Sequence, residues 1–565
     1  MRQPARMDAL NALQTGDQAF DIIVIGGGIT GAGVAREAAA SGLRTLLVEQ
    51  RDFAWGTSSR SSKMVHGGLR YLGSGQFRLT RDAVRERQRL LEELPGLVRP
   101  LQFLMPHYRR QFPGPRIFGL LLAVYDLFAG RRSRRRLNPA EALNWVPGLA
   151  KEHLIGASGF TDAVTDDARL VQRILEEARA SGAWCLNYLK ADVVGGNGTS
   201  RLVRLHDTSG AASANSSFEL SAAVIVNATG AWATSPAVCQ ASQNDEGIRR
   251  TIRPLRGSHL VVPYDTLPVS CSVSLLHPED RRPVFAFPWH GMTVLGTTDL
   301  DHPAPLDLEP HITDEELHYL LKIATTLFPG TSLGKDDVVA SWAGVRPVVS
   351  EGSSKSPSKE NREHVIWDTN GVVSVAGGKL TTYRQIAREI LAECRQYLPD
   401  LELPDERLKV FTPPPAPHEP GGQRPASISH SDWERLQGSY GPALPQVLDA
   451  GAQTRIPGTE TYWCELIWAA GHADVVHLDD LMLRRSRLGL VLPDGGRHRL
   501  DDIQHQCRHA LSWNSDTWAA ERERYLALWQ SHYSLPPESP VPNVGSPDSS
   551  PFASEDTSEV ANESH

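Results

Sequence analysis

The stretch FDIIVIGGGITGAGVAREAAASGLRTLLVEQ, residues 20–50, constrains the fold of this chain more than any other segment. An apolar run ends at Ile25, glycines and an alanine-rich segment follow, and a second apolar run ends at Val48. A strand, a helix and a second strand in this order form a βαβ unit, whose parallel strands are buried on both faces. The sequence therefore predicts an α/β fold built on a parallel sheet.

Within this unit, Gly26, Gly28 and Gly31 satisfy the G-x-G-x-x-G pattern of Rossmann-type nucleotide-binding domains. The glycines permit a tight turn, close approach of a pyrophosphate and close helix–strand packing, and the helix N-terminus favours an anion. Glu49 closes the second strand, where a carboxylate hydrogen-bonds a ribose hydroxyl and repels the 2′-phosphate of NADP. A glycine turn that binds nothing would not need these flanking features. The motif predicts a dinucleotide and leaves FAD and NAD open.

Later segments indicate how the chain is divided. The segment ending in VIVNATGAWA and the segment NGVVSVAGGKLTTYRQIAREILAEC each run from an apolar strand into a glycine turn. Short alternating strands between them are typical of an antiparallel sheet. We expect a nucleotide-binding domain from residues 20–100, 161–256 and 346–397, and a β-rich substrate domain from residues 101–160 and 257–345.

The other segments differ in composition. At 565 residues, the chain is longer than one hydrophobic core usually organises. Residues 1–19 are predicted to be a leader, and the Pro- and Gly-rich residues 398–427 a linker. Residues 428–534 are predicted to form a helical C-terminal domain, and the Pro/Ser-rich, acidic residues 535–565 a disordered tail.

Composition excludes several classes of function. A net charge of −8 gives no support for nucleic-acid binding. The six cysteines are scattered without a C-x-x-C pair, which fits a reducing compartment and predicts no metal site. The N-terminus has no apolar signal region, and no apolar run approaches the length of a membrane span. We therefore expect a cytoplasmic protein.

Several segments together resemble one known family, the FAD-dependent glycerol-3-phosphate dehydrogenases. The stretch DIIVIGGGITGAGVAREAAASGLRTLLVEQRDFAWGTSSRSSKMVHGGLRYL is similar to the N-terminus of that family. The segments FTDAVTDDARLV, VNATGAWA, LRGSHLVVP, FPWHGMTVLGTTD, WAGVRPVV, NREHVIWD and VAGGKLTTYR follow in the family's order. DDLMLRRSRLGL extends the resemblance into the C-terminal domain, so that it covers roughly residues 20–530.

The resemblance implies FAD as the cofactor and a glutathione-reductase-like, DAO-type fold, with a β-rich substrate domain and a C-terminal helical cap domain. It places the cofactor against four groups of residues. These are Thr57, Ser58, Ser59 and Ser62 at the diphosphate and flavin; Val193 near the adenine; Ala228, Thr229 and Gly230; and Gly378, Lys379, Leu380 and Thr381 near the flavin ring.

The resemblance also implies a reaction, the oxidation of sn-glycerol 3-phosphate to dihydroxyacetone phosphate, with electrons passed to a membrane quinone. An oxidase that uses oxygen is the nearest alternative, and a non-catalytic flavin-binding redox sensor is an alternative of another class. A homodimer is left open.

The substrate's phosphate requires cations, because Arg and Lys form charge-assisted hydrogen bonds to phosphate oxygens. Arg346 stands first because its neighbours are small and apolar, where an unpaired charge is costly; Lys379 and Arg70 follow glycine pairs. A surface salt bridge is the alternative for each cation. Thr381 would also contact the substrate. Tyr71 and Tyr383 would orient it, although packed aromatics are commoner.

The C2 hydroxyl must lose a proton, and histidine is the natural acceptor because its pKa lies near neutrality. His66 in MVHGG precedes flexible glycines and is our first choice as the base. His259 in RGSHLVV is the second choice, with a packed strand residue as its alternative.

Two basic segments suggest contacts beyond the substrate. RIFGLLLAVYDLFAGRRSRRR, residues 116–136, combines a short apolar helix with an arginine run, which fits an anionic membrane surface on the inner face of the cell membrane. A buried helix with a solvated basic loop is the alternative. In DDLMLRRSRLGL, Arg484, Arg485 and Arg487 either pair with Asp479 and Asp480 or contact the first domain.

Overall fold

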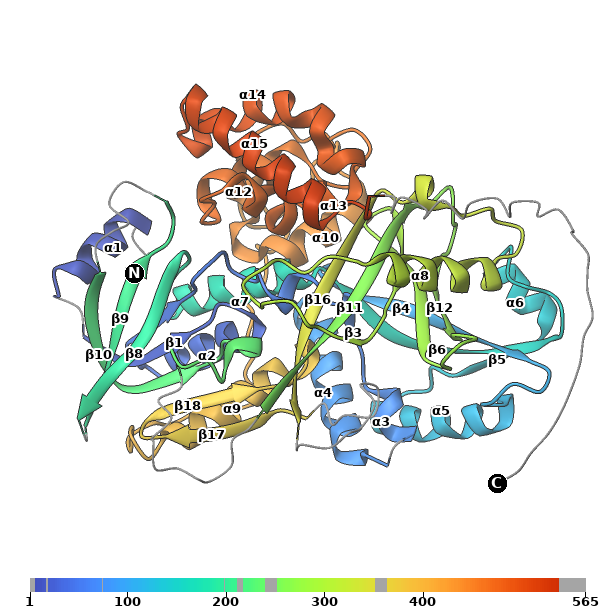
Figure 1. The fold of residues 1–565 in the computed structure, drawn as a ribbon, viewed down its shortest axis with the longest axis horizontal. Helices are drawn as coiled ribbons and strands as arrows, with labels where there is room; N and C mark the ends of the chain where they lie inside the picture. The colour runs from blue at the N-terminus through green and yellow to red at the C-terminus, as the bar shows by residue number, and fades with distance from the viewer. Residues whose placement is uncertain are drawn as a thin grey trace, which may run out of the picture.

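The protein forms two β-sheets that lie side by side, with the C-terminal helices packed across the region between them (Figure 1). This computed structural model describes residues 6–16, 19–73, 75–197, 199–210, 217–238, 251–350 and 363–537. The predicted α/β fold with a second, β-rich part and a helical C-terminal part is confirmed.

The first sheet has eight strands and contains the predicted βαβ unit. Its main path runs β17-β18-β10-β1-β2-β7, and β8 and β9 continue it from β10 as an antiparallel ribbon. The pairs that join β18, β10, β1, β2 and β7 are parallel. The strands are β1 (Phe20–Ile25), β2 (Thr45–Val48), β7 (Trp184–Leu186), β8 (Leu189–Asn197), β9 (Ser200–Asp207), β10 (Ser217–Asn227), β17 (Val365–Thr369) and β18 (Val372–Ala376).

Alternation along β1 divides its side chains between two cores, as the two faces of a strand require. Ile22 and Val24 pack with the helices α2 (Ile29–Ala40), α7 (Asp167–Ala180) and α9 (Tyr383–Cys394). Ile23 and Ile25 pack on the opposite side with β8, β9 and the N-terminal helix α1 (Arg6–Gln14). The segment expected to be a leader thus contributes a packed helix.

The second sheet has ten strands and is almost wholly antiparallel, with one parallel pair between β12 and β4. Its path is β15-β11-β14-β13-β12-β4-β6-β3, with β16 beside β11 and β5 beside β6. The strands are β3 (Met64–Val65), β4 (Val98–Tyr108), β5 (Arg135–Leu137), β6 (Leu154–Thr165), β11 (Thr251–Pro263), β12 (Ser272–Leu276), β13 (Pro283–Trp289), β14 (Met292–Gly296), β15 (Leu300–Asp301) and β16 (Ala340–Ser350). Because β11 and β16 form one long ladder, Arg346 belongs to this sheet.

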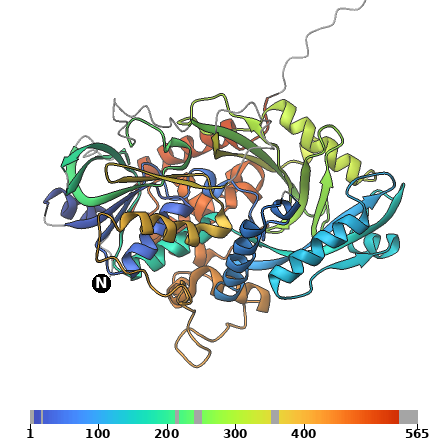
Figure 2. The same cartoon turned by 90° about the horizontal axis from the view of Figure 1, so that it is seen from below.

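Helices cover the second sheet and the region between the sheets. On the side away from the C-terminal helices lie α3 (Leu69–Gly73), α4 (Phe77–Glu93) and α5 (Pro115–Ala129), as Figures 1 and 2 show. The other helices of the second part are α6 (Pro139–Trp145) and α8 (Asp314–Leu327). Across the described ranges, we find no helix with the length and apolar character that crossing a membrane requires.

The C-terminal part is helical, as predicted. It comprises α10 (His430–Tyr440), α11 (Leu444–Asp449), α12 (Trp463–His472), α13 (Leu488–Val491), α14 (Leu500–Leu511) and α15 (Ser515–His532). Residues 398–427, the expected linker, contain no helix or strand, but Val410 and Phe411 are buried against the first part. Residues 538–565, most of the expected tail, lie outside the described residues.

Candidate active site

The glycine turn after β1 leaves no room for side chains. Gly26 has φ +109°, and its N–H donates to the carbonyl of Val48 at 2.8 Å. A Cβ on Gly26 would lie 2.6 Å from the carbonyl oxygen of Ala228, and a Cβ on Gly31 would lie 1.9 Å from that of Gly26. The backbone of this turn and the N-terminus of α2 are therefore brought close together, as a bound pyrophosphate requires.

Glu49 and Ser58 complete this turn with side-chain oxygens. The carboxylate of Glu49 accepts N–H groups from Gly27 at 2.7 Å and from Arg51 at 2.9 Å. Loss of solvation raises the pKa of the Glu49 carboxyl, and the two backbone donors oppose that shift. Ser58 Oγ accepts the N–H of Ile29 at 2.9 Å, in the first turn of α2. A carboxylate has about four lone-pair positions, so Glu49 keeps capacity for a ribose hydroxyl.

Most of the predicted cofactor residues gather at one edge of the first sheet. Ile25 is in register with Asn227 on one side and Val48 on the other, and Asn227 is in register with Ser374. Because the strands are parallel, the segments that follow them meet at one edge, where open α/β sheets bind ligands. These segments carry Gly26, Gly28, Gly31, Glu49, Ala228, Thr229, Gly230, Gly378, Lys379, Leu380 and Thr381.

Open space accompanies one of these glycines. Gly230 has φ +66°, and a Cβ there would meet nothing within 4 Å. Gly378 also has a positive φ, of +93°, but a Cβ there would lie 2.8 Å from Cδ1 of Ile386. Val193 lies in the antiparallel ribbon, where its N–H donates to the carbonyl of Ala237 at 2.8 Å. Positive-φ glycines, open space and a helix N-terminus fit a dinucleotide such as FAD.

One segment, residues 57–71, connects this edge with the second sheet. Thr57 Oγ1 donates to the carbonyl of Val345 in β16. Ser62 Oγ lies 2.8 Å from Nε2 of His259 in β11. Thr381 Oγ1 donates to the carbonyl of His66 at 3.4 Å. The segment therefore contacts β11 and β16 of the second sheet and the turn before α9.

His259 is buried on the face of β11 that meets this segment, with 1% of its surface exposed. Its ring stacks on Trp342 with centroids 5.0 Å apart and an interplanar angle of 18°. Burial holds the pKa of His259 well below its ordinary value, and the charges of Arg346 and Lys63 act in the same direction. Among the described residues, Nδ1 of this ring has no hydrogen-bond partner.

Arg346 lies on the same face as His259, because alternate residues of paired strands point to one side. The register pairs His259 with Trp342, Gly257 with Gly344 and Leu255 with Arg346. The guanidinium lies 3.1 Å from the carboxylate of Asp299 and 3.3 Å from Oγ1 of Thr297. A Cβ on Gly257 would lie 2.5 Å from Nη2 of Arg346. The guanidinium of Arg346 therefore lies directly against Gly257, where no side chain could fit.

Lys379, Tyr71 and His66 form a second group of predicted site residues. Nζ of Lys379 lies 3.6 Å from the ring centroid of Tyr71, and the rings of Tyr71 and His66 are 6.3 Å apart. Leu380 and Thr381 lie in a short 3₁₀ turn, Leu380–Thr382, with Thr381 buried.

One predicted substrate residue, Tyr383, stands apart from the others. Tyr383 is buried against α2, where a Cβ on Gly33 would lie 2.7 Å from its ring, so its position is that of a packed aromatic. Arg70 lies in α3, and its side chain is outside the described part of the chain.

The structure adds partners that were not predicted. Thr297 and Asp299 hold Arg346, and Trp342 supports His259. The signal for the first two was present in GTTD, a polar run directly after a buried strand. Trp342 gave no such signal, because its role depends on the pairing of β16 with β11.

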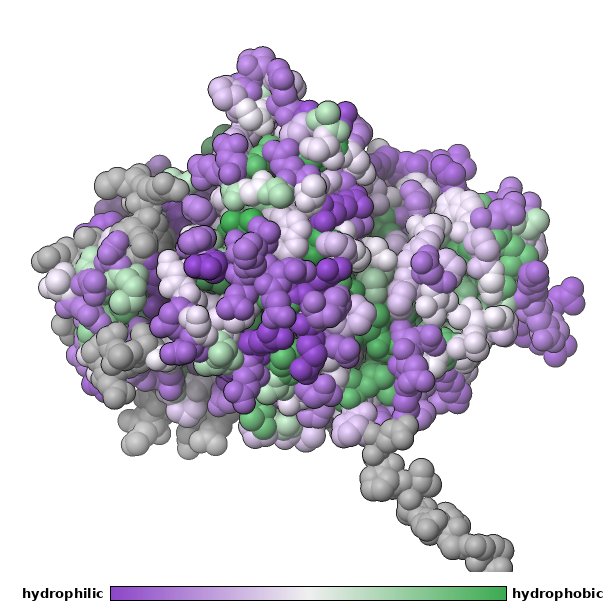
Figure 3. Space-filling model, turned by 90° about the horizontal axis from the view of Figure 1, so that it is seen from above, coloured by the Kyte–Doolittle hydropathy of each residue, from purple (hydrophilic) through white to green (hydrophobic). Residues whose placement is uncertain are grey.

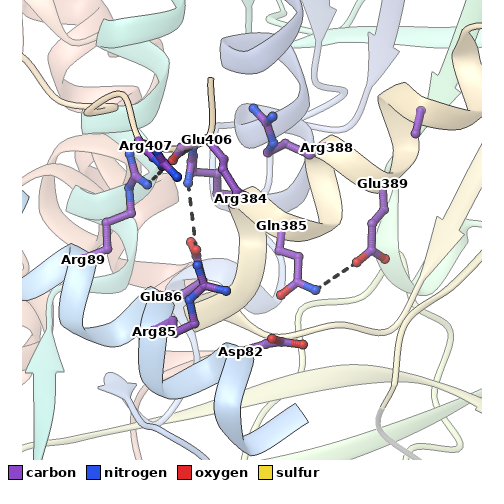
Figure 4. A pocket seen from close by; sticks show the side chains of 11 residues that line it. Asp82, Arg85, Glu86, Arg89, Arg384, Gln385, Arg388, Glu389, Glu406 and Arg407 are labelled. Carbon is purple, nitrogen blue, oxygen red and sulfur yellow. Dashed lines mark hydrogen bonds and ion pairs between the residues drawn. The ribbon is translucent and has the colours of Figure 1, made fainter. Parts of the chain in front are cut away.

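A separate cavity of about 480 Å³ lies between α4, α9 and residues 406–407 (Figure 4). It is lined by charged side chains, several of which are already paired: Arg388 lies 2.9 Å from Glu37, and Arg384 lies 3.9 Å from Glu86. None of the predicted site residues lines it. Across the described ranges, no cluster of His, Cys, Asp and Glu has the arrangement to hold a metal ion.

Comparison with known proteins gives the family of this chain. The sequence profile of the DAO family, FAD dependent oxidoreductase, matches residues 21–384. Glycerol-3-phosphate dehydrogenase 2 of Mycobacterium tuberculosis is 34% identical over 539 residues, which are 91% of this chain and 88% of that protein. Aerobic glycerol-3-phosphate dehydrogenase of Bacillus subtilis is 34% identical over 76% of this chain and 79% of that protein.

Solved structures show the same fold. The glycerol-3-phosphate dehydrogenase of Bacillus halodurans, complexed with FAD, superposes with a TM-score of 0.72 at 26% identity, over 93% of this chain and 97% of that one. An L-α-glycerophosphate oxidase of Mycoplasma pneumoniae with bound FAD shares the fold at a TM-score of 0.54 and 17% identity, over 69% of this chain and 97% of that one. The chain uses FAD and belongs to the family of FAD-dependent glycerol-3-phosphate dehydrogenases.

Proposed function

We propose that this protein oxidises sn-glycerol 3-phosphate to dihydroxyacetone phosphate and passes the electrons to a membrane quinone. The observation that carries the proposal is the shared face of β11 and β16, where a held arginine and a buried histidine lie beside the cofactor edge. The names of the relatives support the substrate. The quinone is proposed from the resemblance to dehydrogenases.

Arg346 and Lys379 hold the phosphate in this proposal. A guanidinium binds two phosphate oxygens at once, and its contacts with Thr297 and Asp299 fix its direction. Lys379 belongs to the second group of site residues, where it lies beside Tyr71. When bound, FAD supplies the acceptor for the hydride that leaves C2 of the substrate.

The proton of the C2 hydroxyl goes to a histidine. We favour His259 over His66, which was our first choice from the sequence. Its lowered pKa leaves the ring neutral near pH 7, and a neutral imidazole has one nitrogen that accepts a proton. Its buried Nδ1 also fits a ligand that provides a hydrogen bond, because an unpaired buried polar atom is costly. His66 is the alternative base, beside Tyr71.

The proposed membrane face is α5 and the residues that flank it. Phe112 is 66% exposed, Leu120 68% and Leu127 77%, and the following Arg131 and Arg132 are exposed. Apolar side chains beside arginines suit the surface of an anionic bilayer. Hydrophilic side chains predominate on the face seen from above, on the side of the C-terminal helices (Figure 3). We therefore propose that α5 meets the inner face of the cell membrane.

The acceptor is tested by turnover on anionic vesicles. The FAD-loaded protein is mixed with glycerol 3-phosphate and vesicles that contain or lack a quinone, and quinol and hydrogen peroxide are measured. The proposal predicts quinol formation with little peroxide. Rapid peroxide formation that quinone does not suppress would favour the oxygen-using oxidase. The double variant Leu120→Glu/Leu127→Glu should reduce vesicle binding and quinol formation while leaving reduction of the flavin by substrate unchanged.

A further inference from the structure

The arginines of DDLMLRRSRLGL join the C-terminal part to the cofactor-binding part. Both contacts considered for them exist. Arg484 donates to Asp480 at 2.5 Å within its own turn and to Asp52, next to the cofactor edge, at 2.5 Å. Arg485 donates to both carboxylate oxygens of Asp52 at 2.7 Å. The side chains of these three partners, Arg484, Arg485 and Asp52, are at most 1% exposed.

Arg487 contacts both the N-terminus of α7 and the segment of residues 57–71. It stands at φ +61° before α13, and its side chain is 2% exposed. The guanidinium donates to Asp166 at 2.8 Å and to Asp167 at 2.5 Å, at the N-terminus of α7. It also donates to the carbonyl of Ser59 at 3.4 Å. One side chain of the C-terminal part thus contacts the segment that carries Ser62.

Asp167, which Arg487 contacts, also binds residues of the same segment. Its carboxylate, which is fully buried, accepts both the N–H of Ser61 at 3.1 Å and the hydroxyl of Ser61 at 2.7 Å. It also accepts Nζ of Lys63 at 2.9 Å. Lys63 in turn donates to the carbonyl of Ser59 at 2.5 Å, so the ends of residues 59–63 are tied to each other.

Lys63 connects this network to the histidine. Its ammonium group lies 4.6 Å from the ring centroid of Trp342, on which His259 stacks. Trp342 Nε1 also donates to the carbonyl of Ser61 at 3.3 Å. The neighbouring Ser62 makes the direct contact with Nε2 of His259. Residues 59–63 therefore hold the histidine ring both by its edge and through the tryptophan beneath it.

We propose that Arg487 is a positioning residue, which fixes residues 59–63 through Asp167 and Lys63 and thereby sets the ring of His259 for the reaction. Arg487 lies outside the matched family profile, residues 21–384, and its guanidinium meets the predicted cofactor residues at the carbonyl of Ser59. The helical C-terminal part then serves as more than a cover, because it completes the support of the active-site segment. The proposal rests on the proposed function only for the catalytic role of His259.

The network is tested first without substrate. Amide hydrogen exchange is measured in the FAD-loaded full chain for wild type, Arg487→Ala and Arg487→Lys. We expect faster exchange of residues 57–66 in Arg487→Ala and an intermediate rate in Arg487→Lys, which keeps the charge but not the fork of donors. The control is Arg435→Gln, which breaks the ion pair of 2.7 Å with Glu465 inside the C-terminal part. That variant should loosen its own helices and leave residues 57–66 protected.

The second readout is flavin reduction by glycerol 3-phosphate in an anaerobic stopped-flow instrument. Since a misplacement of about 1 Å can cost about a hundredfold in rate, we expect the limiting rate in Arg487→Ala to fall by about tenfold or more. The apparent Kd for substrate should change much less, because the phosphate cations are untouched. Arg487→Lys should recover part of the rate. If Arg487→Ala yields no FAD-loaded protein, Arg487→Lys decides alone on the same two readouts.

The outcomes are distinct. Unchanged protection of residues 57–66 in the Arg487 variants, or an equal loss in Arg435→Gln, would overturn the positioning role. Faster exchange with an unchanged rate of flavin reduction would overturn its link to His259. A wild-type flavin that glycerol 3-phosphate does not reduce would refute the proposed function instead, and the exchange data would still decide whether Arg487 fixes the segment.

Discussion

Ser62 Oγ lies 2.8 Å from Nε2 of His259, although the two residues are 197 positions apart in the chain. This hydrogen bond joins the segment after the cofactor turn to β11 of the second sheet. It places a neutral, buried imidazole where the two sheets meet, on the face that also carries Arg346.

Replacement of the two candidate histidines separates their roles. In His259→Gln we expect flavin reduction to slow by about 10²- to 10⁴-fold, the contribution of a general base. His66→Gln should slow reduction far less, while both variants retain FAD. Stopped-flow reduction and the flavin content of the purified proteins measure the two effects. If flavin reduction were slower in His66→Gln than in His259→Gln, His66 would be the base.

Arg346→Gln should weaken substrate binding and raise the pKa of His259. Loss of a charged hydrogen-bond donor costs about 1.5–3 kcal/mol, so substrate affinity should fall by about tenfold to a hundredfold. Because the charge of Arg346 helps lower the pKa of His259, the lower limb of the pH–rate profile should move to higher pH. The control is Arg253→Gln, whose pair with Asp301 in the same sheet is partly exposed and should matter little. Equal effects of the two substitutions would contradict the assignment.

Gly31→Ala should disrupt the cofactor turn. The added Cβ would lie 1.9 Å from the carbonyl oxygen of Gly26, and overpacking of this kind costs about 1–3 kcal/mol. We expect a lower Tm and less bound FAD, measured by thermal unfolding and by visible absorbance. Gly119→Ala in α5 is the matched control, since a Cβ there would meet nothing within 4 Å. It should leave FAD unchanged and raise stability by about 0.5–1 kcal/mol.

His290 should make the stability of the folded chain depend on pH. Its ring nitrogens lie 3.5 Å from Asp166 and 3.4 Å from Glu460 in the C-terminal part. Burial opposes protonation, but the hydrogen bonds to these two carboxylates outweigh it and raise the pKa of His290. Because the pKa of His290 is higher in the folded chain than in the unfolded chain, protonation of His290 stabilises the folded state. This stabilisation is fully present below the unfolded pKa of about 6.5 and is lost as the pH rises through the folded pKa.

The His290→Gln variant tests this dependence. Its Tm should fall furthest below the wild-type Tm in acid and approach it as the pH rises. His505→Gln, at an exposed position of α14, should show no such trend. A wild-type advantage that is constant across the pH range would contradict the proposed ion pairs.

The local parts of the fold and the site were predictable from the sequence. The turn at Gly26, the strands around it and the convergence of Ala228 and Gly378 follow from short patterns and from parallel strand ends. The support of His259 was not predictable, because it depends on long-range contacts: Arg487 and Asp167 are 320 positions apart. Tyr383 shows a related limit, since the rotation of α9 against α2 directs its ring into the core.

The central claim is that this chain oxidises glycerol 3-phosphate at the face shared by His259 and Arg346. Its most direct test is the anaerobic addition of sn-glycerol 3-phosphate to the FAD-loaded protein, followed by the visible absorbance of oxidised flavin. We expect rapid bleaching and one dihydroxyacetone phosphate formed for each flavin reduced, with slow bleaching in His259→Gln. A flavin that stays oxidised with this substrate, yet is reduced by dithionite, would show that glycerol 3-phosphate is not the substrate.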